Sequence, residues 1–289
     1  MKKLNILATT DDGYLSRNFE ILCSNLSAQG HNVYRVAPLQ NKSCISAALE
    51  SPATGKFNFT VKDDKFLVVD ATPSDCVHFA KAYFKDTKFD LCVSGINFGE
   101  NTGIHSLHSG TVMAAITASS YGIPSIAVSS AHTTNDVSFD KAYEDSIFSI
   151  LSKLIKVLLK LSKPLYFKDD KNAVVLNFNI PAAIYKNPIA CISSTTSYKM
   201  SISSISEGDS GSVAQVSSEL QPAMYGDSTL LSLGHPTITI LSQRLDVAGI
   251  PQNFTNALLE TSILLDTQND TTYGQCKSPI SLYISSIRN

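Results

Sequence analysis

Residues 90–129 read DLCVSGINFGENTGIHSLHSGTVMAAITASSYGIPSIAVS, and the fold class follows from their pattern. An apolar run at 90–94 predicts a buried strand, and a second run at 123–129 predicts another. Between them, after a glycine-containing loop, we expect a helix that begins near Ser109 and ends at Tyr121. A strand, a helix and a strand at this spacing form a crossover between parallel strands, so the segment predicts an α/β fold.

The same alternation extends to both sides of this segment. Phe19, Leu22, Cys23 and Leu26 share one helical face, and Gly30 marks the end of that helix. The further predicted elements are strands at 4–8, 33–37 and 174–180, a hairpin of 57–61 and 66–70, and helices at 16–29, at 74–84 with Ser74 as its cap, and at 140–162. Together these elements predict a Rossmann-like, mostly parallel sheet with helices on both faces.

The helix predicted at 140–162 has two interpretations. Its lysines, Lys153, Lys156 and Lys160, are compatible with a helix that lies on a membrane surface. Its apolar stripe is typical of a helix that covers a sheet, and this second interpretation is favoured. The stripe consists of Ile147, Ile150, Leu151, Leu154 and Leu158.

The character of the chain changes after the last predicted strand of this series. We expect residues 1–188 to form the Rossmann-like catalytic core and 189–233, which alternate and are rich in Ser and Gly, to form a protruding β-hairpin arm. Residues 234–289 are expected to hold a strand at 237–241 that returns to the sheet, a C-terminal helix at 253–265 and a polar tail.

Composition excludes several classes of protein. The chain has 289 residues and a formal net charge of −2, without the basic face of a nucleic-acid binder. Its 6 cysteines form no C-x-x-C pair, which favours reduced thiols over a zinc site or a disulfide framework. No export signal and no membrane-spanning segment is recognisable, so a cytoplasmic protein without a membrane partner is expected.

Polar side chains follow the predicted strands, where ligands bind in a parallel sheet. They are Thr10, Asp11 and Asp12 after the first strand, Ser43 after the second, and Asn97, Asn101 and the run Ser109-Gly110-Thr111 after the strand at 90–94. Carboxylate, hydroxyl and amide oxygens suit a hard ion such as Mg²⁺ or Mn²⁺. The alternative is that Asp11-Asp12-Gly13 is only a turn between a strand and a helix.

Ser109-Gly110-Thr111 also has two interpretations. The free N–H groups and two hydroxyls at the start of a helix can bind a phosphate, or Ser109 can act simply as a helix cap. His105 and His108 lie three residues apart in the same loop and could bind a transition metal. No third ligand is evident, so zinc is not favoured.

Several motifs together resemble the SurE survival-protein nucleotidases. They are Asp11-Asp12-Gly13, Ala37-Pro38 with Ser43 and Ser46, Ala71-Thr72-Pro73-Ser74-Asp75-Cys76, and the run 93–129 with Ser94-Gly95-Ile96-Asn97 and Ser109-Gly110-Thr111; Asp227, Gly234 and 237–239 match weakly. The match is good over about the first 130 residues, and several motifs in order are more specific than one.

This resemblance implies a metal-dependent phosphomonoesterase that acts on nucleoside 5′- and 3′-monophosphates, with Asp11 and Asp12 as catalytic residues. The resemblance implies one divalent ion, Mg²⁺ or Mn²⁺, held by Asp11, Asp12, Ser43 and Asn97. It also implies phosphate binding around Thr10, Asn101, Ser109, Gly110 and Thr111, and a homodimer or homotetramer built through the arm and the C-terminal helix.

The chain departs from the family pattern at several of these positions. Thr10 stands where the family has Asn, Cys44 where it has Gly, and His108 where it has Tyr; further departures are His105, Ala71 and Ile240. Two rivals to the nucleotidase follow. One is a catalytically impaired homologue that binds metal and nucleotide, and the other is a haloacid-dehalogenase-type phosphatase, although its aspartyl nucleophile calls for a D-x-D motif.

Overall fold

The computed structural model describes residues 2–50, 55–131, 141–161, 174–182, 191–192, 197–208, 211–221 and 226–241. The strands of the main sheet are β1 (Asn5–Thr9), β2 (Asn32–Pro38), β3 (Phe59–Asp63), β4 (Phe66–Val69), β5 (Leu91–Phe98), β6 (Ser125–Ser130), β7 (Val175–Ile180), β8 (Cys191–Ile192) and β11 (Thr237–Leu241). The helices are α1 (Arg17–Ala28), α3 (Pro73–Tyr83), α4 (His105–His108), α5 (Gly110–Ser120), α6 (Lys141–Leu161) and α7 (Asp227–Ser232).

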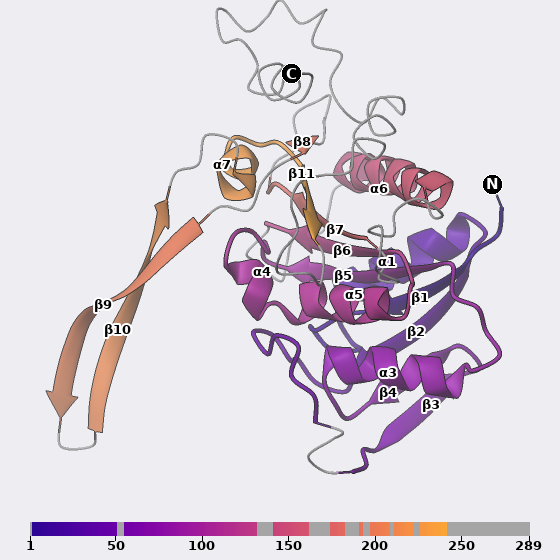
Figure 1. Ribbon diagram of the computed structural model, residues 1–289, viewed down its shortest axis with the longest axis horizontal. Helices are drawn as coiled ribbons and strands as arrows, with labels where there is room; N and C mark the ends of the chain where they lie inside the picture. The colour runs from indigo at the N-terminus through magenta and orange to yellow at the C-terminus, as the bar shows by residue number, and fades with distance from the viewer. Residues whose placement is uncertain are drawn as a thin grey trace, which may run out of the picture.

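The main sheet is mostly parallel, with the order β3-β4-β2-β1-β5-β6-β7-β11-β8 (Figure 1). Six neighbouring strands, β4, β2, β1, β5, β6 and β7, all run in one direction. In contrast, β3 pairs antiparallel with β4, and β11 pairs antiparallel with β7. The predicted α/β class and Rossmann-like sheet are confirmed. The reversal of strand order on either side of β1 places the carboxyl ends of β1, β2 and β5 beside one another, where ligands bind in such sheets.

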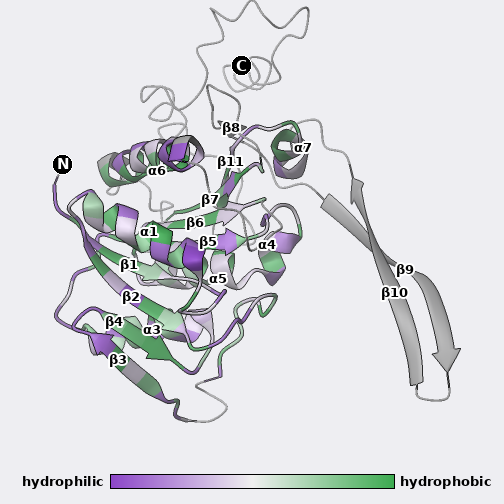
Figure 2. Ribbon diagram, turned by 180° about the vertical axis from the view of Figure 1, so that it is seen from behind, coloured by the Kyte–Doolittle hydropathy of each residue, from purple (hydrophilic) through white to green (hydrophobic). Residues whose placement is uncertain are grey.

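Helices cover both faces of the sheet. One core cluster joins α1 and α6 to alternate residues of the strands, such as Ile6 and Ala8 of β1. The other cluster joins α3 and α5 to the intervening residues, such as Leu7. Figure 2 shows the central strands as largely hydrophobic, which is expected of strands buried on both faces.

The packing interpretation of α6 is confirmed. The five residues of its predicted apolar stripe are all buried, and they belong to the same core cluster as Phe19 of α1. Among the described residues, no helix combines the length and the hydrophobicity that a membrane crossing requires.

Two local predictions are wrong. The cap of α3 is Thr72 rather than Ser74, because Pro73 occupies the first helical turn and the Thr72 hydroxyl accepts the Asp75 N–H. Strand β5 also continues beyond Ser94 to Phe98. After a register shift it pairs again with β6, so Asn97 lies in the strand and not in the following loop.

The predicted arm contains an antiparallel pair, β9 (Ser197–Gly208) and β10 (Gly211–Gln221), which extends away from the main sheet (Figure 1). Helix α7 also falls within 189–233 but returns to the core, where the Asp227 carboxylate accepts the Gly103 N–H at 3.0 Å. The helix predicted at 253–265 and the polar tail lie outside the described residues. The three domain boundaries stay predictions, and so does the role of the arm in oligomerisation.

Gly95 provides a test of the β5–β6 packing. A Cβ at Gly95 would lie 2.2 Å from the Val128 carbonyl oxygen, and the residue has a φ of +125°. We expect Gly95→Ala to lower the free energy of unfolding by about 3 kcal/mol or more, because a backbone carbonyl cannot move aside without breaking the sheet.

Gly30→Ala is the matched control for this measurement. Gly30 also has a positive φ of +88°, but a Cβ there meets nothing within 4 Å. Its loss should be about 1 kcal/mol, from backbone conformation alone. Urea unfolding of both variants measures the difference, and equal losses would contradict the close contact with Val128.

Candidate active site

Asp11 follows β1 and lies at the N-terminus of α5. Its side chain is 2% exposed, its Oδ2 accepts the Thr111 N–H at 3.1 Å, and its Oδ1 accepts the Thr111 hydroxyl. A Cβ on Gly110 would lie 2.8 Å from the Asp11 Cβ, so only glycine allows this approach. Burial raises the pKa of Asp11, and the hydrogen bonds from Thr111 and Gly110 oppose that shift.

Asp12 is the second carboxylate and has fewer donors. Its Oδ2 accepts the Phe98 N–H at 3.0 Å, a bond that joins the end of β1 to the end of β5. Burial, followed by the neighbouring negative charge of Asp11, raises the pKa of Asp12 to about 7. The pair is therefore costly to ionise fully without a nearby positive charge.

Asn97 adjoins Asp12 through this bond to Phe98. Its Nδ2 donates to the Gly99 carbonyl oxygen at 2.7 Å. In the described part of the chain, neither Asn97 Oδ1 nor Asp12 Oδ1 carries a hydrogen bond. Each side chain therefore keeps one oxygen available to a ligand.

Ser43 lies in the loop that follows β2. The loop meets Asp11 through its backbone, because the Lys42 N–H donates to the Asp11 carbonyl oxygen at 2.7 Å. Ser43 itself is exposed, and its N–H donates to Asn41 Oδ1 at 2.8 Å. The structure thus brings together the segments that carry all four predicted metal ligands, whose binding of an ion stays a prediction.

The hydroxyls predicted to bind phosphate have partners within the protein. Ser109 caps α5 by accepting the Val112 N–H at 3.1 Å, so it acts as a helix cap, and Thr111 binds Asp11. Thr10 is buried, and its Oγ1 accepts the Asp12 N–H at 3.2 Å. The phosphate-binding role of these residues stays a prediction.

Asn101 belongs to a buried polar network. Its Nδ2 donates to Ser129 Oγ at 2.9 Å, its N–H donates to Asn179 Oδ1 at 2.8 Å, and its carbonyl oxygen accepts Asn177 Nδ2 at 2.7 Å. Sequence reasoning missed Asn177 and Asn179. Two asparagines at alternate positions of the apolar strand VLNFNI place polar groups on one buried face, which is the signal that could have found them.

Transition-metal and thiol sites find no support in the described residues. His105 and His108 are both exposed on α4, and no group of three or more His, Cys, Asp or Glu in the described segments could hold a metal. The predicted metal ligands are two carboxylates, a hydroxyl and an amide, so only two of them belong to these four residue types and they would not form such a group. Cys23, Cys76 and Cys92 are buried free thiols, and burial raises the pKa of each.

Comparison with known proteins identifies the family. The family model described as survival protein SurE matches residues 6–204, more than half of the chain. The chain belongs to the SurE family. The nucleotidase-family resemblance inferred from the motifs is confirmed.

Relatives and solved structures agree with this SurE assignment. The chain is 40% identical over 181 residues to the 5′-nucleotidase SurE of Clostridium beijerinckii, a match that covers 62% of this chain and 67% of that protein. It is 34% identical to the 5′-nucleotidase SurE of Neisseria meningitidis serogroup C, covering 62% and 66%. The crystal structure of SurE from Aquifex aeolicus matches with a TM-score of 0.68 at 27% identity, covering 83% of this chain and 94% of that one.

The raised pKa of Asp12 gives this SurE chain a pH-dependent stability. Between its ordinary value of 3.8 and about 7, the folded state holds a proton that the unfolded state releases, so stability falls as pH rises through this window. We expect Asp12→Asn to raise the free energy of unfolding by about 1–3 kcal/mol at pH 8 and by much less at pH 5. Urea unfolding in EDTA at both pH values measures this, and a pH-independent difference would contradict it.

Cys44 has an uncommon backbone conformation next to Ser43. Its φ is 60°, in the left-handed region where a Cβ is unfavourable. We expect Cys44→Gly to be more stable than Cys44→Ala by about 0.5–1 kcal/mol, because both remove the thiol and only glycine relieves the strain. Thermal unfolding compares the two variants, and equal stability would show that the strain is absent in solution.

Proposed function

We propose that this chain is a divalent-metal-dependent phosphomonoesterase that hydrolyses nucleoside 5′-monophosphates and also 3′-monophosphates. The observation that carries the proposal is the pair of adjacent carboxylates, the buried Asp11 and the partly buried Asp12, with the pKa of Asp12 raised to about 7 beside Asn97. The names of the relatives, 5′-nucleotidase SurE, support the substrate class. Homodimer or homotetramer assembly and a cytoplasmic location belong to the same proposal.

The residues fit a hard divalent ion. Asp11, Asp12, Ser43 and Asn97 offer only oxygen ligands, the type that Mg²⁺ and Mn²⁺ prefer, and the two carboxylates need a positive charge nearby. When bound, such an ion supplies a charge that polarises a phosphoryl oxygen and lowers the pKa of water.

The chain's own residues orient the groups of the reaction. Asp11 is fixed by Thr111 and Gly110, so its position changes little when a ligand arrives. Asp12 Oδ1 carries no hydrogen bond among the described residues, so Asp12 is suited to orient a water. Asn101 and the Ser109-Gly110-Thr111 segment border the place where the phosphate would bind.

The geometry argues against an aspartyl nucleophile. Both oxygens of Asp11 accept hydrogen bonds from Thr111, and the side chain is almost fully buried. These bonds make the Asp11 oxygens weaker nucleophiles, although each keeps a lone pair that could bind a metal ion. Neither Asp11 nor Asp12 begins a D-x-D motif, because residues 13 and 14 are Gly and Tyr, so a haloacid-dehalogenase-type mechanism is not favoured.

The impaired-binder alternative rests on Thr10, Cys44 and His108, and the structure bears most directly on Thr10. Its hydroxyl accepts the Asp12 N–H, so it is directed toward the chain's own backbone, where the family's Asn would offer an amide donor. This alternative predicts that metal and nucleotide bind without turnover.

Phosphate release from a panel of nucleoside 5′- and 3′-monophosphates, with Mg²⁺, Mn²⁺ or EDTA, tests the proposal. We expect metal-dependent release, and about a hundredfold loss or more in Asp12→Ala. Asp64→Ala, which removes an exposed carboxylate of the β3–β4 turn, is the matched control and should keep full activity.

The other outcomes separate the alternatives. Release that persists in EDTA contradicts the metal requirement. Folded protein that binds nucleotide and Mn²⁺ without releasing phosphate supports the impaired binder, and Thr10→Asn should then restore turnover.

A further inference from the structure

The loop of residues 39–50, here called the Ser43 loop, buries little of itself. Ser43 and Cys44 are exposed, and so are residues 47–49. Hydrophobic packing therefore contributes little to its conformation, and hydrogen bonds must fix it instead. Leu39, the first residue of the loop, continues the sheet, and its N–H donates to the Val69 carbonyl oxygen at 2.8 Å. Beyond Leu39, the loop is hydrogen-bonded to other described segments at three places.

Two of these places adjoin the candidate active site. At the first, Lys42 N–H bonds the Asp11 carbonyl oxygen, and a Cβ on Gly13 would lie 3.1 Å from Gln40 carbonyl carbon. At the second, Ser46 N–H donates to the His108 carbonyl oxygen at 2.9 Å and Ser46 Oγ donates to that of Leu107 at 2.7 Å. The first contact is made by Lys42, the residue before Ser43, and the second by Ser46, three residues after it.

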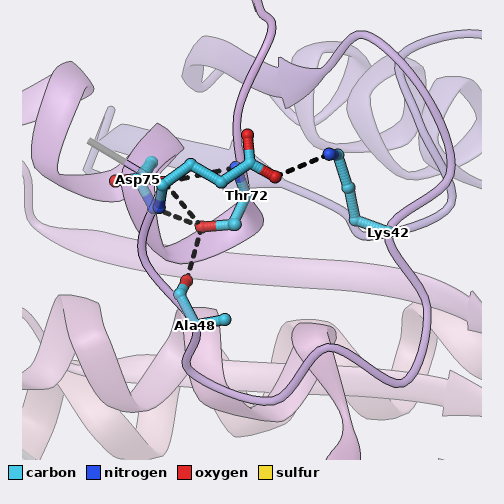
Figure 3. Close-up of polar contacts among 5 residues, drawn as sticks. Lys42, Ala48, Thr72 and Asp75 are labelled. Carbon is cyan, nitrogen blue, oxygen red and sulfur yellow. Dashed lines mark hydrogen bonds and ion pairs between the residues drawn. The ribbon is translucent and has the colours of Figure 1, made fainter. Parts of the chain in front are cut away.

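The third place is the N-terminus of α3, 24 and 25 residues further along the chain (Figure 3). Thr72 Oγ1 donates to the Ala48 carbonyl oxygen at 2.7 Å, and the Glu50 N–H donates to Asp75 Oδ2 at 2.8 Å. Lys42 Nζ then reaches back across the loop to Glu50 Oε1 at 2.7 Å.

Thr72 and Asp75 do more here than cap a helix. A capping box is complete when the Thr72 hydroxyl accepts the Asp75 N–H and the Asp75 carboxylate accepts the Thr72 N–H, and both bonds are present. Thr72 Oγ1 lies 2.7 Å from the Ala48 carbonyl oxygen and 3.0 Å from Asp75 Oδ2, so its single proton is better placed for Ala48. Asp75 Oδ2 also accepts the Glu50 N–H, so the Ser43 loop is bound through the backbone of Ala48 and Glu50.

We propose that Thr72 and Asp75 are positioning residues that hold the Ser43 loop against Asp11, so that the Ser43 hydroxyl stays at the metal site. The proposal rests on the proposed function, because Ser43 matters only if the site binds a divalent ion. It gives a role to the motif at 71–76, which the carboxylate pair and the phosphate-binding segment leave unused. Neither residue touches the reacting atoms.

Hydrogen exchange and metal binding test this role without requiring turnover. In Thr72→Val, we expect the amides of Ser46 and Glu50 to exchange about tenfold faster or more, since the far anchor of the loop is lost. We expect the dissociation constant of Mn²⁺, measured by calorimetry, to rise about three- to tenfold because one of four ligands is no longer held. Thr72→Ser keeps the hydroxyl and should restore both values.

Thr117→Val is the matched control. It makes the same chemical change on α5, where the Thr117 hydroxyl contacts Ser74 of α3 and the Met113 carbonyl oxygen and not the Ser43 loop. Exchange in the loop and Mn²⁺ binding should match the wild type. Where Thr72→Val shows no cooperative melting, the isosteric Asp75→Asn replaces it. Asp75 Oδ2 accepts both the Glu50 and the Thr72 N–H groups, and a neutral amide oxygen is a weaker acceptor than this carboxylate oxygen.

Kinetics give the readout that general destabilisation would not produce. The Mn²⁺ concentration for half-maximal phosphate release should rise in the anchor variants, while kcat at saturating Mn²⁺ stays within about twofold of the wild type. Unchanged loop exchange in a folded anchor variant, or equal changes in Thr117→Val, would overturn the proposal. A wild type that releases no phosphate would refute the nucleotidase alone, because the exchange and Mn²⁺ results stand without it.

Discussion

The carboxylate of Asp11 lies at the N-terminus of α5, and the hydrogen bonds that hold it there join the segments of the candidate site. A buried carboxylate loses its hydration, and the N–H groups of a helix end together with the helix dipole replace part of it. Thr111 supplies both a hydroxyl and an N–H, and Gly110 leaves room for the approach. This contact fixes the end of β1 against α5, and the loop after β2 then attaches to the Asp11 backbone through Lys42.

The two adjacent aspartates consequently have different environments. Asp11 is held by several donors, whereas Asp12 has the single Phe98 N–H and a pKa raised to about 7. A turn alone does not require a buried carboxylate next to a partly buried one that has a single donor. We therefore favour a functional role for the pair over the turn interpretation of Asp11-Asp12-Gly13, which stays a prediction, although Gly13 does have the positive φ of +88° that such a turn uses.

Much of the fold could be predicted from the sequence, because the apolar runs are long enough to be buried on both faces of the sheet. The Ser109 cap was predictable, since a hydroxyl precedes a clear helical period. Ser74 is a wrong prediction because Ser and Thr are both good caps. Pro73 at the start of the helix and Asp75 three residues after Thr72 are the signals that favour Thr72.

The parts of the site that could not be predicted depend on contacts distant in sequence. Asn97 lies within β5 because the strand pairs again with β6 after a register shift, and no local pattern encodes this. Likewise, the partners of Asn101 are side chains of β7 and β6, and those of Thr72 and Asp75 include the backbone of the Ser43 loop.

The N-termini of α5 and α3 share one design, which bears on the charge of the site. Both helices cover the same face of the sheet, and each has a carboxylate at its N-terminus: Asp11 for α5 and Asp75 for α3. The donors that a phosphate would use at a helix end are thus already satisfied in part by the protein. Lys42, the cation nearest in the chain to Ser43, is paired with Glu50.

An anionic substrate that approaches this edge would therefore meet the partly exposed carboxylate of Asp12, while the compensating positive charge of Lys42 is already paired with Glu50. Binding a phosphate monoester, which is also anionic, requires that charge to come from elsewhere. The proposed divalent ion would supply this charge, since it would lower the energy of the ionised carboxylates and attract the substrate. The electrostatics of the two helix ends therefore support the proposed metal dependence, as the oxygen-only ligand set does.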